Sequence, residues 1–239
     1  MDSDVPMSAQ IVVATVASYA AGWLIGSPAL VPLLNTLAGY PFMLDALRRG
    51  QIRLAVARML VWALALAVCA TLLSYGRPWQ TDTLFINGAA YRQEMFAWVM
   101  SGRGAESTPS QFIPQQAMHA LGVSALALVS GGLLAMLMGA ILMNYMGHYV
   151  GALAATSAHP AVTMVLGWHP WAVIRIASFV AIAIVLSTPL LGRLYAFRID
   201  RDDARRIVVF GLVGLLADVV LKALLAPAWQ RLLLRVVGW

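Results

Sequence analysis

Residues 117–166 read AMHALGVSALALVSGGLLAMLMGAILMNYMGHYVGALAATSAHPAVTMVL, an apolar tract from which the fold class of the chain can be predicted. It contains no aspartate, glutamate, lysine or arginine. A helix crosses the roughly 30 Å of bilayer hydrocarbon with about 20 mainly apolar residues, so the stretch is too long for one span. We expect two spanning helices, at 117–142 and 146–166, folded as a hairpin with its turn near Asn144, Tyr145, Met146 and Gly147.

The composition of the whole chain agrees with a membrane protein. Of its 239 residues, 61% are hydrophobic and only 11% are charged, and the mean hydropathy is +0.80. Soluble domains contain roughly 45–50% apolar and about 25% charged residues. The apolar runs extend from one end of the chain to the other. We therefore expect an all-α, polytopic transmembrane helix bundle that forms a single membrane-embedded domain over 1–239.

Four further apolar runs complete a count of about six spans. Pro28 and Pro32 interrupt the chain after the first run, so the segment that follows is expected to be a re-entrant or interfacial piece rather than a span. Five spans remain an alternative. The further spans are expected at about 10–30, 56–75, 171–192 and 206–227.

The distribution of arginine predicts the orientation, because short cytoplasmic loops carry an excess of arginine and lysine. The sequence has two groups of arginines, one before the second span and one between the last two spans. Both groups can lie on the cytoplasmic side only if 117–166 crosses the membrane twice. Both termini then face the non-cytoplasmic side, with Asp2 and Asp4 outside, in a cell membrane of the bacterial inner-membrane type. The two basic groups are Arg48, Arg49 and Arg53, and Arg193, Arg198, Arg201, Arg205 and Arg206.

The main external loop is expected at about 76–116. Within it, Tyr91, Met95, Trp98 and Val99 fall at helical spacing, which predicts a short amphipathic helix on the bilayer surface. The C-terminal tail after Pro227 has a similar pattern and predicts a second interfacial helix. Both segments are expected to cap the spans and not to form a separate domain.

The net charge of +6 does not indicate nucleic-acid binding, because the basic residues are scattered at the ends of apolar runs. Cys69 is the only cysteine, so no intramolecular disulfide can form. The sequence has no P-loop, GxGxxG or GxSxG motif. We predict no cofactor.

Ionisable residues inside a membrane are energetically expensive and invite a functional hypothesis. Asp218 lies near the middle of the last span, and Lys222 follows one helical turn later on the same face. Arg175 lies about one turn into the preceding span, at the same end. These three residues are expected to form one intramembrane cluster, which is either a proton- or cation-binding site or a structural ion pair with basic side chains that reach the interface.

Four other polar residues are candidates for lining a cavity: Asn144, His148, His159 and His169. Two of these histidines precede prolines, where an imidazole can satisfy backbone groups that proline leaves free. No histidine has a metal-ligand spacing with another ligand on one helix, so no metal site is predicted. A thioether-rich patch for a soft ion is a weaker alternative, formed by Met136, Met138, Met143 and Met146 with His148.

Three classes of function remain. Short loops and stripes of small residues, such as Gly147, Gly151 and Ala155, favour a non-catalytic accessory subunit or assembly factor that packs against other membrane subunits or a second copy, surrounded by lipid. The alternative is a small-solute or ion transporter that uses the Arg175, Asp218 and Lys222 cluster. The third is a lipid-acting enzyme, which the lack of a paired acid and base does not favour. Its candidate residues are Asn144, His148 and His169 with the loop acids Asp82, Glu94 and Glu106.

Overall fold

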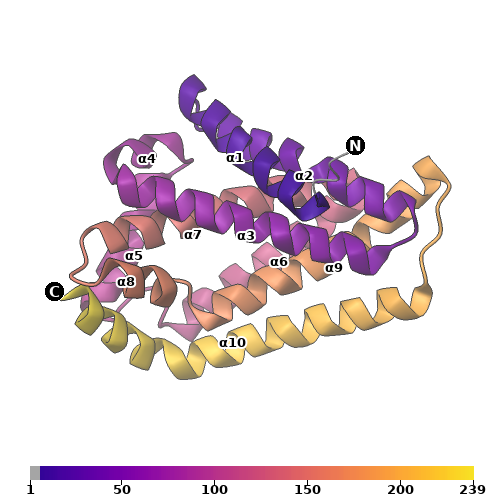
Figure 1. The fold of residues 1–239 in the computed structure, drawn as a ribbon. Coiled ribbons are helices and arrows are strands. Elements are labelled where there is room, and N and C mark those ends of the chain that lie inside the picture. Colours follow the sequence, from indigo (N-terminus) through magenta and orange to yellow (C-terminus); the bar gives the residue numbers. More distant parts are fainter. Residues whose placement is uncertain (1–5) are drawn as a thin grey trace.

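The computed structural model describes residues 6–239, and no strand occurs in this range. Asp2 and Asp4, expected outside, lie outside the described residues. Seven of the helices are long and apolar enough to cross a membrane: α1, α2, α3, α6, α7, α9 and α10. The predicted class, a polytopic helical bundle, is confirmed (Figure 1). The helices are α1 (Met7–Ile25), α2 (Leu30–Arg48), α3 (Ile52–Gly76), α4 (Pro78–Leu84), α5 (Gly88–Ser101), α6 (Pro109–Ser130), α7 (Leu133–Ala155), α8 (Pro160–Gly167), α9 (Pro170–Tyr195) and α10 (Arg201–Val237).

The central apolar tract does form a helical hairpin, but its turn lies elsewhere than predicted. The chain reverses between α6 and α7 at Gly131 and Gly132, whose φ angles of 60° and 89° are readily adopted only by glycine. The residues predicted to form the turn, 144–147, lie inside α7. The predicted spans 117–142 and 146–166 are therefore replaced by α6, α7 and the short helix α8.

The segment predicted as re-entrant or interfacial forms α2, a 19-residue helix of spanning length. Pro32 is its third residue, where a backbone N–H would have no acceptor within the helix, so the proline is tolerated there. Arg58 of α3 holds the other end of α2, because its guanidinium donates to the carbonyl oxygen of Phe42 at 3.0 Å and to Asp45 Oδ2 at 2.7 Å. The prediction from proline positions therefore gave this segment too little helix.

The two predicted interfacial helices are part of the bundle. The loop helix is α5, and its Met95, Trp98 and Val99 are buried in one cluster with residues of α7 and α10. The tail is not a separate helix, since α10 continues through Pro227 for 37 residues. At 1.5 Å per residue it is about 55 Å long, well beyond the roughly 30 Å hydrocarbon core. Figure 1 shows α10 bending in its yellow C-terminal part.

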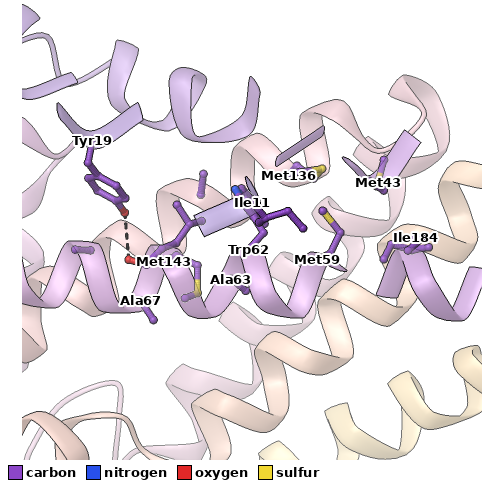
Figure 2. Packing of buried hydrophobic residues seen from close by; sticks show 14 of the residues in the cluster. Ile11, Tyr19, Met43, Met59, Trp62, Ala63, Ala67, Met136, Met143 and Ile184 are labelled. Carbon is purple, nitrogen blue, oxygen red and sulfur yellow. Dashed lines mark hydrogen bonds between the residues drawn. The ribbon is translucent and has the colours of Figure 1, made fainter. Parts of the chain in front are cut away.

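Close backbone approach at glycines holds two helix pairs together. A Cβ at Gly151 of α7 would overlap the carbonyl oxygen of Thr71 in α3, and a Cβ at Gly147 would overlap Ala70. Gly214 of α10 is equally close to the Ser178 hydroxyl of α9. The central cluster around α3 is rich in methionine, with Met43, Met59, Met136 and Met143 (Figure 2).

The two basic groups lie at one end of the bundle. Arg53 at the start of α3 pairs with Asp203 at the start of α10 at 2.6 Å. A Cβ at Gly50 would lie 2.9 Å from the carbonyl oxygen of Arg198. The α2–α3 and α9–α10 connections therefore meet, and the long segment between α3 and α6 lies at the opposite end.

Candidate functional site: a polar-ended cavity in the bundle

A cavity of about 220 Å³ lies inside the bundle, lined by residues of α2, α3, α5, α6, α7 and α9. We call the end of the bundle that carries the two basic groups the arginine-rich end. Toward this end the cavity walls are apolar, with Met59, Met136 and Ile184. Gly139 of α7 also lines it, and a Cβ there would meet no atom within 4 Å. The missing side chain at Gly139 therefore helps to keep the space open.

The polar lining residues come from segments at the opposite end of the bundle. They belong to α5, to the connection before α6, to the first half of α6, to the middle of α7 and to the start of α9. The cavity is thus amphipathic along its length, apolar at one end and polar at the other. The polar lining residues are Tyr91, Glu94, Glu106, Gln115, His119, Tyr145, His169 and Arg175.

Two ion pairs hold this polar end together. Arg175 Nε of α9 lies 3.3 Å from Asp218 Oδ2 of α10. Lys222 Nζ donates to Glu106 Oε1 at 2.8 Å and lies 4.8 Å from the centroid of the Phe112 ring. Both Asp218 and Lys222 are 1% exposed, so each charge depends on its partner for stabilisation.

The structure brings Arg175, Asp218 and Lys222 into one cluster but pairs them differently from the sequence expectation. The expected neighbours Asp218 and Lys222 do not pair, and Lys222 bonds instead to Glu106, 116 residues away in the chain. No local signal pointed to this partner, because Glu106 stands in a polar loop with no periodic relation to α10.

Glu106 is ionised at neutral pH. Burial alone would raise the pKa of its carboxyl, but the charges of Lys222 and Arg175 outweigh that effect and lower the pKa below its usual range. The two ion pairs of the polar end, Arg175 with Asp218 and Lys222 with Glu106, therefore balance each other in charge, and Glu94 also lines this end.

His169 immediately precedes α9 and faces the cavity from within an aromatic cluster. Its ring stacks on Trp171 with 4.8 Å between centroids and meets the edge of Trp98 at 5.3 Å. Burial, with the charges of Lys222 and Arg175, lowers the pKa of His169 to about 4, although Glu106 acts in the opposite direction. The imidazole is neutral at pH 7. Its Nε2 is buried and makes no hydrogen bond with the part of the chain that the structure describes.

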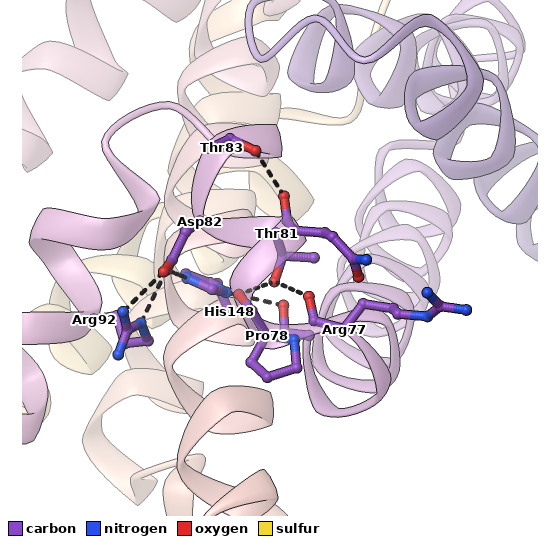
Figure 3. Close-up of polar contacts among 9 residues, drawn as sticks. Arg77, Pro78, Thr81, Asp82, Thr83, Arg92 and His148 are labelled. Atoms are coloured by element: carbon purple, nitrogen blue, oxygen red, sulfur yellow. Dashed lines mark hydrogen bonds and ion pairs between the residues drawn. The ribbon is translucent and has the colours of Figure 1, made fainter.

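The other predicted cavity residues do not line this space. Asn144 Oδ1 accepts a hydrogen bond from the Tyr19 hydroxyl at 2.5 Å. His159 is exposed just before α8. His148 is fully buried, and its ring nitrogens bond to the Ser74 hydroxyl at 3.1 Å and to Asp82 Oδ1 at 2.8 Å. Figure 3 shows His148 and Arg92 meeting at Asp82.

Ser74, His148 and Asp82 are arranged like the nucleophile, base and acid of a catalytic triad. Their surroundings indicate instead that they stabilise the packing of the helices. Ser74 and His148 are 0% exposed, and none of the three lines the cavity. Asp82 also forms a two-bond pair with Arg92, at 2.8 and 2.9 Å. Burial would raise the pKa of Asp82, but the bonds from Arg92 and His148 lower it. The group ties α4 and α5 to α3 and α7.

Within residues 6–239, no three histidine, cysteine, aspartate or glutamate side chains gather closely enough to hold a metal ion. Met136, Met143 and Met146 of the thioether-rich patch line the cavity. The patch does not include a free imidazole, because both ring nitrogens of His148 already have partners.

Fold and site together define a polytopic α-helical membrane protein with an amphipathic internal cavity. No protein-family model, no curated protein and no solved structure matches this chain.

Proposed function

We propose that the protein is a small-molecule carrier of the cell membrane that takes a hydrophobic or amphiphilic solute into the bundle cavity. The observation that supports this most is the cavity itself, apolar over most of its length and with a charged cluster at one end. Ligand sites are typically concave and mostly apolar, with a few convergent polar groups. Buried intramembrane charges are also typical of transport pathways.

Gly139 indicates that the cavity is more than a gap left by loose packing. In α7, Gly147 and Gly151 are required by contact with α3, whereas Gly139 faces open space. A glycine inside a helix is destabilising by roughly 0.5–1 kcal/mol relative to alanine. Packing gives no reason for glycine at this position, and an occupant of the cavity would supply one.

Cysteine reactivity tests the proposal. In a Cys69→Ala background, Gly139→Cys places a thiol in the cavity, and Ala140→Cys places one in the core, where Ala140 is 0% exposed. A carrier cavity predicts that N-ethylmaleimide alkylates Gly139→Cys at least tenfold faster than Ala140→Cys in the native protein. Equal, slow alkylation of both thiols would mean a sealed void and would overturn the carrier proposal.

The proposed location is a bacterial-type inner membrane with the arginine-rich end in the cytoplasm. If all seven long helices cross, the termini lie on opposite sides and the N-terminus joins the arginine-rich side. This differs from the six-span expectation, which placed both termini outside.

An accessory-subunit function stays a prediction with its own test. Most residues in the apolar part of α10 are not buried within this chain, so their surface is available to lipid or to a partner helix. Purification in mild detergent followed by mass determination distinguishes the cases. Stoichiometric protein partners would support a subunit, and a lone monomer or homodimer would support the carrier.

A further inference from the structure

The dimensions of the cavity restrict the shape of its occupant. Along α9 the lining extends from Ala172 to Ile184, which is about 18 Å at 1.5 Å per residue. Half of the roughly 30 Å hydrocarbon core, the depth reached by one acyl chain, is about 15 Å. The volume of about 220 Å³ exceeds the ~150 Å³ of a cavity that holds benzene. Beyond Arg175 the α9 lining continues to Ile184, about 14 Å further, which is the length of a single extended chain of about ten carbons and leaves no room for a two-chain phospholipid.

The polar end offers unused hydrogen-bonding capacity. Arg175 approaches Asp218 only through Nε, and its two terminal nitrogens make no hydrogen bond within residues 6–239. The guanidinium lines the cavity, as does the unpartnered Nε2 of His169. A guanidinium with free terminal nitrogens suits a carboxylate or phosphate, because its N–H groups match two oxygens at once.

The nearby negative charges do not occupy the same place. Glu106 is held by Lys222 at 2.8 Å, and Asp218 lies behind Arg175 and does not line the cavity. Glu94 is exposed. Arg175 is the one arginine or lysine among the described residues that line the cavity, so an anion in the cavity would pair with it.

We propose that the cavity binds a single-chain amphiphile with an anionic headgroup, with the head at Arg175 and His169 and the chain along α7 and α9 toward Met59 and Met136. This inference rests on the proposed function only in requiring that the cavity admits a solute. Carboxylate and monoalkyl phosphate heads share the chemistry, and the test separates them.

Protection of the Gly139→Cys thiol provides the test, in phosphatidylcholine nanodiscs and the Cys69→Ala background. The probes have the same ten-carbon chain: decanoate, decyl phosphate, decanol and decyltrimethylammonium. We expect decanoate or decyl phosphate to slow alkylation by N-ethylmaleimide about tenfold, at concentrations where the neutral and cationic probes have no effect. The stronger of the two anions identifies the headgroup.

Charge-matched variants assign the effect to Arg175. Arg175→Gln alone would leave Asp218 as an uncompensated buried charge, so the double variant Arg175→Gln/Asp218→Asn is used. The double variant should lose protection by the anions, and Arg175→Lys should retain part of it. Equal protection by decanol and decanoate would overturn the anionic headgroup and leave the carrier proposal standing. An unreactive Gly139→Cys thiol would instead refute the carrier proposal.

Discussion

Lys222 Nζ donates to Glu106 Oε1 at 2.8 Å, which joins the middle of the longest helix to the connection that precedes α6. Both side chains are largely buried, Lys222 at 2% and Glu106 at 16% side-chain exposure. Glu106 of this pair lines the polar end of the cavity, and the neighbouring pair of Arg175 and Asp218 completes the same cluster.

Removing one member of this pair should be more harmful than removing both. Lys222→Met should lower the free energy of unfolding by about 3 kcal/mol, because it leaves Glu106 ionised without a partner. Lys222→Met/Glu106→Gln should recover most of that loss. Thermal unfolding in detergent, arranged as a double-mutant cycle, measures the coupling. Additive losses in the double variant would show that the two groups are not coupled.

Asp82→Asn should destabilise the attachment of α4 and α5. It removes the partner of Arg92, whose side chain is only 13% exposed, so a loss of about 3 kcal/mol is expected. Breaking the Arg53–Asp203 pair by Arg53→Ala is the control, with an expected effect below about 1 kcal/mol, because Arg53 is 66% exposed. Proteolysis of the segment between α3 and α6 reports the effect. Similar cleavage rates in both variants would contradict a structural role for Asp82.

The same substitution should have opposite effects at two glycines of α7. Gly139→Ala should raise the free energy of unfolding by about 1 kcal/mol, because alanine is the better helix former and its Cβ meets nothing within 4 Å. Gly151→Ala should destabilise the protein, since its Cβ would overlap the Thr71 carbonyl oxygen. The melting temperatures of the two variants, each compared with that of the unaltered protein, test whether the effects are opposite. A gain at Gly151 would mean that α3 and α7 are less closely packed than described.

His169 should make stability depend on pH in a defined window. The unfolded chain binds this proton near pH 6.5 and the folded chain near pH 4. The unfolded state therefore holds more protons between these values, and the free energy of unfolding falls as pH falls from about 6.5 to about 4. The loss approaches 3 kcal/mol at about 1.4 kcal/mol per pH unit. His169→Phe should lose this dependence, whereas an unchanged pH profile would place the effect elsewhere.

Cysteine labelling in intact cells should show whether α2 crosses the membrane. Ala29 and Gln51 flank α2 and are both exposed. In a Cys69→Ala background, a membrane-impermeant maleimide added outside should label Ala29→Cys and not Gln51→Cys. Protection of both positions would restore the re-entrant interpretation.

Hydropathy and arginine placement determined the class of the protein and the sharing of one end by the two basic groups. The class of protein can be predicted from local sequence, because each spanning helix must be apolar over its own length whichever helices it packs against. The same reasoning missed α2, because proline is disruptive on average but not in the first turn, where Pro32 lies. It also misplaced the hairpin turn, since backbone conformation at Gly131 and Gly132 is not visible in hydropathy.

The residues of the site were brought together by helix packing, which the sequence pattern does not show. Gly139, Gly147 and Gly151 look alike in the sequence, yet one faces a cavity and two touch α3, because the rotation of α7 about its axis is fixed by its neighbours. The partner of Lys222 likewise depends on where a loop 116 residues away returns to the bundle. By itself the sequence determined that buried charges must find partners, and the packing of the helices determined which partners they found.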